Sequence, residues 1–341
     1  MRDGVIARRH CGLARRQLLL VALAAAAAGR TRAAAADAAA AEQPVAAPPA
    51  VEIAAGVYVV PGLRGLPDAD NLGRIGNAGF IVGRLGVMAI DCGTSRQHGD
   101  ALLGAIAQVT PLPVQIALVT HTRQEFLFGA SAFQARGIPV VMHKAAAELM
   151  AARCETCLKT LRRELGDGPM RGTSMFTPDR TFEESHVIES IGRPVFVQHH
   201  GHSSGPGDIS VFDVRTRTLF AGGLLDNGRI PDIIDSRLEG WQQALAALRT
   251  LRADAVVPGH GRYADAELIN TVERYLVRLQ RRVASLLRSG TALSDVPDAA
   301  LLPEYAAWDQ VDTVHRRNAS VLFLRLERRL LIDDPVEGTR P

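Results

Sequence analysis

Short apolar segments alternate with segments of helical periodicity in both halves of this chain, and this alternation restricts its fold more than any other feature. A strand pair is expected at 51–60, with its bend at Gly56. The first half then places helical spacing between apolar runs, with strands expected at 78–82, 87–91, 114–120 and 138–142 and helices at 97–108, 125–136 and 144–165. The second half repeats the pattern, with strands expected at 181–189, 194–199, 208–213, 217–221 and 253–258 and helices at 236–251 and over much of 264–331. Two such sheet-building halves predict an α/β or α+β fold.

The composition agrees with a globular protein that builds its own core. Of 341 residues, 47% are hydrophobic and 22% are charged, which is too apolar for a disordered chain. The net charge of +3 lies at the N-terminus, because residues 1–42 hold seven arginines against Asp3, Asp37 and Glu42. The remainder is therefore close to neutral, and we expect no nucleic-acid partner.

The first 42 residues have the pattern of an export signal. Arg15 and Arg16 precede a short apolar stretch and an alanine-rich tract, which resembles the twin-arginine type of signal. Its apolar part is shorter than the ~20 residues that span a bilayer, and no later run has that length, so we expect no membrane insertion once the signal is removed. Residues 43–50 then form a proline-containing linker. We therefore expect a periplasmic protein.

Three segments place a histidine where an expected strand ends. His121 follows the strand at 114–120, His202 lies in a glycine-rich turn before the strand at 208–213, and His260 lies in a Pro-Gly-His-Gly turn after the strand at 253–258. Polar groups beyond the carboxyl ends of strands are where α/β folds place their ligands. Imidazoles from scattered loops are also how zinc sites are assembled. The pattern predicts a shared pocket.

The cysteines of the helix expected at 144–165 allow three interpretations. Cys154 and Cys157 stand three residues apart, so they share one helix face. They are small buried residues in the simplest interpretation. A disulfide in an oxidising compartment and a redox-active pair are the alternatives.

The segments around 91, 121, 200–208, 219–222 and 258–261 resemble, in order and spacing, the signature segments of the metallo-β-lactamase superfamily. The resemblance covers roughly residues 51–265 and implies a four-layer αββα sandwich, with 266–341 as a C-terminal helical extension packed on the same domain. A finer resemblance is to the exported quinoprotein relay system zinc metallohydrolases, through the stretch from Asp68 to Phe80 and the residues from His315 to Asn318. The family implies hydrolysis by a zinc-bound hydroxide.

The zinc ligands that this resemblance implies are largely replaced. The family signature His-x-His-x-Asp-His keeps His121 but has Arg123, Glu125 and Phe126 at its later positions. Gly223 stands where the family usually has an aspartate that bridges two zinc ions. Arginine offers no lone pair and repels a cation. We therefore expect at most one weakly held zinc ion, bound by His121, His202 and His260, with Ser204 as the alternative to His202.

Two functions follow, with the substrate undefined in both. In the first, the chain is a non-catalytic or weakly active member of the fold whose pocket binds a small molecule. Arg123 would then bind an anionic group of that molecule. In the second, a single zinc ion activates water, Glu125 accepts a proton, and Asp226 replaces the lost carboxylate. Arg123 is also expected to pair with Glu125 or Asp91. A role beside a periplasmic quinoprotein system follows from the resemblance alone.

Overall fold

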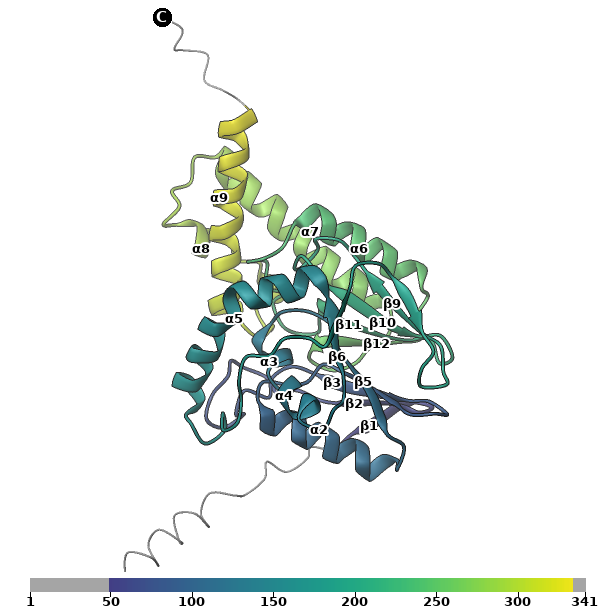
Figure 1. Ribbon diagram of the computed structural model, residues 1–341. Coiled ribbons are helices and arrows are strands. Elements are labelled where there is room, and N and C mark those ends of the chain that lie inside the picture. Colours follow the sequence, from purple (N-terminus) through teal and green to yellow (C-terminus); the bar gives the residue numbers. More distant parts are fainter. Residues whose placement is uncertain (1–48, 334–341) are drawn as a thin grey trace, which may run out of the picture. The chain divides into compact units, whose positions relative to one another are not determined.

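Residues 49–333 are described by a computed structural model, and they contain a first sheet of seven strands (Figure 1). The expected export signal at 1–42 and most of the expected linker lie outside the described residues. The strands follow one another in chain order, antiparallel from β1 to β4 and parallel from β4 to β7. They are β1 (Val51–Ala54), β2 (Val57–Val60), β3 (Ala78–Val82), β4 (Val87–Ile90), β5 (Val114–Val119), β6 (Val140–His143) and β7 (Arg180–Phe182).

A second sheet of five strands has the order β12-β11-β10-β9-β8. Its strands are β8 (His186–Ile188), β9 (Val195–His199), β10 (Ile209–Asp213), β11 (Thr218–Asp226) and β12 (Ala255–His260). Only the β11–β12 pair is parallel among these described strands. The carboxyl ends of β11 and β12 therefore lie side by side, which brings Asp226 opposite His260.

Helices cover the outer face of each sheet and complete four layers. The helices are α2 (Arg96–Val109), α3 (Gln124–Leu127), α4 (Ala130–Gln134), α5 (Lys144–Leu165), α6 (Leu238–Thr250), α7 (Glu267–Arg288), α8 (Val296–Ala299) and α9 (Arg316–Asp333), with short turns of helix at Pro303–Tyr305 and Val311–His315. Helices α2 to α5 pack on the first sheet, and α6 to α9 pack on the second. A third apolar cluster, which includes Ile81, Leu118 and Val211, fills the space between the sheets. The expected αββα sandwich is confirmed.

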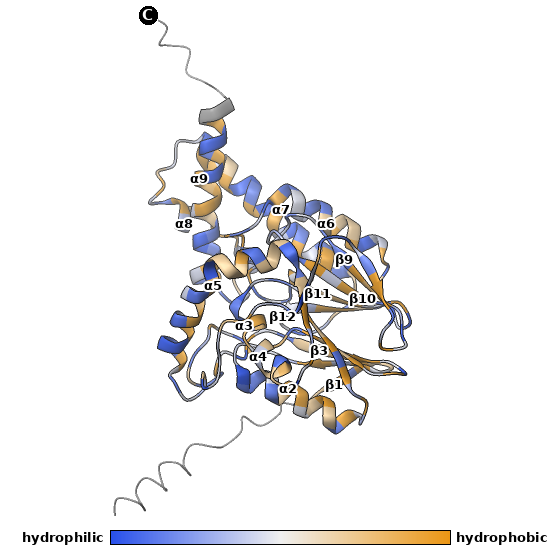
Figure 2. Cartoon of the chain, in the orientation of Figure 1, coloured by the Kyte–Doolittle hydropathy of each residue, from blue (hydrophilic) through white to orange (hydrophobic). Residues whose placement is uncertain are grey.

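Hydropathy follows these layers. The strands are mostly hydrophobic along their length, whereas the helices alternate between hydrophobic and hydrophilic residues (Figure 2). This difference arises because each helix buries one face only. Helices α7, α8 and α9, which follow residue 265, share their hydrophobic core with β11. No helix within residues 49–333 is both long enough and apolar enough to span a membrane.

Some expected elements have different limits in the structure. The helix expected at 125–136 is two short helices, because Cys92 N–H bonds the Phe126 carbonyl and Gly129 N–H bonds the Gly93 carbonyl. In a continuous helix, the Phe126 carbonyl and the Gly129 N–H would bond other residues of the same helix. Here they bond the loop after β4 instead. The strand expected at 181–189 is divided between the two sheets as β7 and β8. Strand β11 continues past 221 to Asp226.

Candidate functional site

The end of strand β5 fixes His121 through a chain of hydrogen bonds. Asp91, just after β4, accepts hydrogen bonds from Thr120 N–H at 2.8 Å and from the Thr120 hydroxyl at 2.9 Å. The Thr120 hydroxyl oxygen lies 2.8 Å from His121 Nδ1. Burial, together with the positive charge of Arg123, lowers the pKa of His121 to about 3, so its ring is neutral. Its Nε2 atom is buried and has no hydrogen-bond partner in the described part of the chain.

The ring of Phe126 lies against both retained histidines. Its centroid is 4.2 Å from that of His121 and 5.2 Å from that of His260, and the side chain is 0% exposed. Backbone closes around it, because a Cβ atom at Gly76 would lie 2.6 Å from the Phe126 ring. A phenyl ring has no lone pair to offer a cation. The side of each imidazole that faces Phe126 is therefore apolar.

His260 is held between two buried carboxylates. Its Nδ1 atom lies 2.7 Å from Asp226 Oδ1, and its Nε2 atom lies 2.9 Å from Glu125 Oε1. Burial opposes the charged imidazole, but the two carboxylates outweigh it and raise the pKa of His260. Burial would likewise raise the pKa of Glu125, yet the hydrogen bond and charge of His260, with the charge of Arg123, lower it to about 2. The three groups form a charged network.

Arg123 completes this network. Its Nη1 atom lies 3.5 Å from Asp226 Oδ2, and its Nη2 atom donates to the Asp232 carbonyl at 3.2 Å. The expected pairing with Glu125 or Asp91 is wrong, because β11 extends far enough to place Asp226 beside the guanidinium. When His260 is protonated, the guanidinium, the imidazolium and the two carboxylates together carry no net charge. We call Arg123, Glu125, Asp226 and His260 the charge cluster.

Gly223 adjoins His121 directly. A Cβ atom at Gly223 would lie 2.7 Å from His121 Cδ2 and 3.2 Å from Nε2. Real Cβ atoms do not approach a neighbour as closely as 2.7 Å, so a side chain at 223 requires His121 to move. In this packing, the His121 ring therefore occupies the space that the side chain of an aspartate at position 223 would need.

The structure places His202 and Ser204 in a different environment. His202 Nε2 lies 2.7 Å from the Asp235 carbonyl, and the Ser204 hydroxyl bonds the carboxylate of Asp208. His202 lines a separate cavity that adjoins the start of α6 and the side of α9. Within residues 49–333, no hydrogen bond or ring contact joins His202 to His121.

The donors of this site do not fit a zinc ion. Zinc requires several nitrogen, sulfur or oxygen donors at about 2.0–2.3 Å in a tetrahedral arrangement. His121 offers one nitrogen, both nitrogens of His260 are bonded to carboxylates, and Arg123 brings a positive charge. In the described part of the chain, no three His, Cys, Asp or Glu residues are grouped so that they could hold a metal ion.

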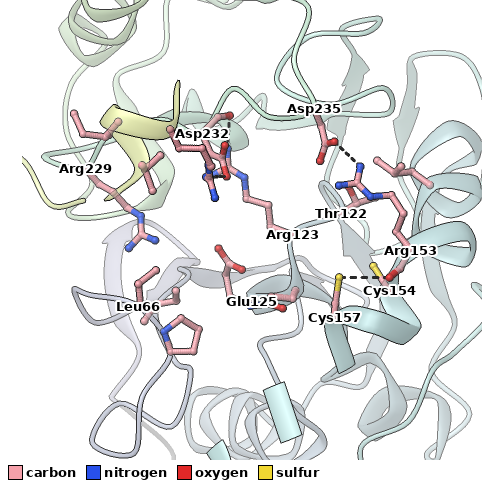
Figure 3. Close-up of a pocket in the computed structure, with 17 residues that line it drawn as sticks. Leu66, Thr122, Arg123, Glu125, Arg153, Cys154, Cys157, Arg229, Asp232 and Asp235 are labelled. Carbon is pink, nitrogen blue, oxygen red and sulfur yellow. Dashed lines mark hydrogen bonds and ion pairs between the residues drawn. The ribbon is translucent and has the colours of Figure 1, made fainter. Parts of the chain in front are cut away.

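A cavity of about 260 Å³ opens beside the charge cluster (Figure 3). Arg123 and Glu125 reach its wall from the β5–α3 turn, and Arg229 faces them across the cavity. Four of the lining side chains are guanidinium groups, and each has an acidic partner: Arg123 with Asp226, Arg153 with Asp235, Arg229 with Asp309 and Arg317 with Asp232. The cavity wall is therefore rich in fixed hydrogen-bond donors.

Sequence reasoning identified part of this site. It selected His121, Arg123, Glu125, Asp226 and His260, and the structure brings all five together. Asp226 is the last residue of strand β11.

Several residues of the site were not predicted. The arginines at 153, 229 and 317 come from α5, the β11–α6 connection and α9, and no local spacing links such distant segments. Phe126 was predicted only as a lost ligand, and its place between the two imidazoles depends on tertiary packing. The hydrophobic run from Phe126 to Phe128 was the available signal that this turn points inward.

Comparisons with known proteins identify a family and a fold. The profile of the Metallo-beta-lactamase superfamily matches residues 72–260, which is more than half of the chain. A search of curated proteins finds no match. The solved structure of a metallo-beta-lactamase from Pontibacter korlensis is 23% identical, with a TM-score of 0.56 over 67% of this chain and 98% of that one. The structure of TMB-1, from a study of substrate and inhibitor binding, is 15% identical, with a TM-score of 0.53 over 67% of this chain and 96% of that one.

Proposed function

Because the chain belongs to the metallo-beta-lactamase superfamily, we propose that it is a member whose metal centre has been replaced by the charge cluster. Its cavity then binds a small anionic molecule instead of supporting zinc hydrolysis. The superfamily typically binds zinc, but in this chain a guanidinium and a phenyl ring lie beside the two retained histidines.

One observation carries the first part of the proposal. His260, a retained histidine, has both ring nitrogens bonded to carboxylates, while the Phe126 ring lies against it and His121. The charge cluster is electrically balanced without a cation. A zinc ion at His260 would have to displace Glu125 and approach Arg123, and a guanidinium repels a nearby cation.

The second part rests on Arg123. Its two terminal nitrogens make one hydrogen bond each, to Asp226 and Asp232, which orients the planar guanidinium. A guanidinium has five N–H donors, so this anchoring leaves donors for a ligand. The side chain is 22% exposed and lines the cavity. Fixed, partly buried guanidinium groups favour carboxylate or phosphate groups through paired hydrogen bonds.

Zinc binding tests the first part. Full-length protein refolded with excess zinc and then dialysed should retain far less than one zinc ion per chain by elemental mass spectrometry. Stoichiometric, tightly held zinc would overturn the proposal. That result would instead favour the mononuclear hydrolase, with His121, His202 and His260 as ligands and Glu125 as the base.

Titration calorimetry with inorganic phosphate and with succinate tests the second part. At least one of these anions should bind, and Arg123→Gln should weaken that binding at least about tenfold, the equivalent of one lost charged hydrogen bond. Arg317→Gln, which leaves the charge cluster intact, should weaken it less. Arg163→Gln, an exposed residue of α5, is the control. No binding of either anion, or equal affinity in the Arg123 variant when circular dichroism shows both folded, would refute anion capture.

We also propose export through the twin-arginine pathway and a place beside a periplasmic quinoprotein system. The support is the sequence at Arg15 and Arg16 and the resemblance of 68–80 and 315–318 to the exported branch. The double substitution Arg15→Lys, Arg16→Lys should abolish export of the full chain in a bacterium that has this pathway. Continued export of that variant by the same pathway would contradict the assignment.

A further inference from the structure

Helix α5 brings two thiols to the wall of the cavity. Cys154 and Cys157 are three residues apart in this helix, so they share one face, and both line the cavity (Figure 3). Cys154 is buried, whereas Cys157 is partly exposed. Both are free among the described residues, so the disulfide that the sequence left open as an alternative is not formed here. The anion-binding function proposed above makes no use of either sulfur.

The surroundings of the two thiols make them chemically unequal. The Cys157 thiol lies 3.7 Å from the Arg153 carbonyl oxygen. The neighbouring Cys154 thiol and the guanidinium of Arg153 favour the Cys157 thiolate, whereas burial opposes it. The charge of Glu125 opposes it more weakly. The pKa of Cys157 is lowered to about 7, while the pKa of Cys154 is raised by the adjacent Cys157 thiol and by burial. Asp235, the partner of Arg153, also disfavours ionisation of Cys154.

Cys157 is also the more accessible thiol, which agrees with its lower pKa. Reactive cysteines are partly exposed and lie beside positive charge, whereas fully buried ones are inert. Cys157 meets both conditions, because it reaches the cavity beside Arg153. Cys154 is only 2% exposed, so Cys157 is the more accessible of the two thiols. Cys92, by comparison, is 0% exposed, and burial raises the pKa of its thiol.

We propose that Cys154 and Cys157 form a redox-active dithiol that exchanges with small disulfides entering the cavity. The Cys157 thiolate attacks one sulfur of the small disulfide, forms a mixed disulfide and releases one thiolate, which takes up a proton from solvent. Cys154 then loses its proton, attacks Cys157 Sγ and releases the second thiol. The protein dithiol is oxidised to a disulfide, and the small disulfide is reduced to two thiols.

The helix makes this disulfide reversible. In a regular helix the Cβ atoms of residues three apart are about 5–6 Å from each other, whereas a disulfide requires about 3.5–4.5 Å. Closing the bond therefore tightens the turn of α5 between Cys154 and Cys157, directly after Arg153. A disulfide under such strain is reduced more readily than a structural one. The geometry thus favours cycling between thiol and disulfide over a permanent crosslink.

Glutathione disulfide is the probe for the first test. Reduced full-length protein is incubated with it, quenched with acid, alkylated, digested and mapped by mass spectrometry. We expect a peptide in which Cys154 and Cys157 have together lost two hydrogens, and glutathione should reverse it. Cys154→Ala should stop at a glutathione adduct on Cys157. Cys157→Ser should slow the reaction at least about tenfold, because the accessible thiolate is the attacking group, and Cys92→Ala is the matched control.

The rate of iodoacetamide alkylation at Cys157 gives a second measurement. It should rise with pH to a half-maximum near 7, in keeping with the lowered pKa of this thiol. No Cys154–Cys157 disulfide in the presence of glutathione disulfide, or a half-maximum above about 8.5, the value of an ordinary thiol, would overturn the proposal. These readouts involve neither zinc nor an anion titration, so their failure is distinguishable from failure of the proposed function.

Discussion

Replacing Glu125 with glutamine tests the charge cluster directly. The amide has nearly the same shape and still offers an oxygen to His260 Nε2, which lies 2.9 Å from Glu125 Oε1. What it removes is one buried negative charge. The imidazolium of His260 and the guanidinium of Arg123 would then face the single carboxylate of Asp226. An uncompensated charge in a buried site strongly destabilises the folded state.

The pKa of Glu125 determines how much stability the Glu125→Gln variant should lose. It is about 2 in the folded protein, against 4.5 for an ordinary glutamate. Each pKa unit corresponds to about 1.4 kcal/mol, so the charged form stabilises the fold by about 3 kcal/mol. Because the folded pKa is lowered, this stabilisation is complete above pH 4.5 and is lost as the pH falls toward 2. The deficit of Glu125→Gln should therefore shrink from about 3 kcal/mol near neutral pH to about 1 kcal/mol near pH 3.

Urea unfolding, followed by tryptophan fluorescence, measures this deficit. Trp241 is fully buried in the core of the second sheet and reports the loss of the fold. The matched control is Glu155→Gln, an exposed residue of α5 whose ion-pair partner within residues 49–333 is Lys159, and it should leave the unfolding midpoint unchanged. A deficit below about 1 kcal/mol at neutral pH, or one that stays constant down to pH 3, would refute the reasoning.

Two further predictions concern His121 and its neighbour. Gly223→Asp, which restores the usual residue of the family, should lower the free energy of unfolding by about 1–3 kcal/mol, because its Cβ would overlap the His121 ring. Urea unfolding and metal analysis check this, and a variant that is equally stable and binds zinc would contradict it. The pKa of His121 is lowered to about 3, so its ring-proton chemical shift, assigned by NMR with His121→Gln, should stay constant as the pH falls from 8 to 5. A midpoint near 6.5 would show that burial does not hold this ring neutral.

Local pattern was enough to predict the succession of strands and helices in two sheet-building halves, whereas the four-layer αββα arrangement was implied by the family resemblance. The helix expected at 144–165 coincides with α5, and the apolar runs in each half became the two sheets. Burial of an apolar face depends on the spacing of residues along one element, which the sequence contains. The prediction of one helix at 125–136 was wrong, because the structure has two short helices there. Backbone groups of this segment pair with the loop after β4, and no local pattern in 125–136 specifies that contact.

The chemistry of the site needed the tertiary structure. The sequence alone established which residue types stand at the ends of the strands: His121 and His260 retained, Arg123 and Phe126 in place of ligands, and glycine at 223. Only the fold decided their partners. The parallel register of β11 and β12 sets Asp226 against His260, while His202 turns to the Asp235 carbonyl. Hydrogen bonds and charge pairs act over a few ångströms between segments distant in sequence, so their partners are fixed by packing and not by spacing along the chain.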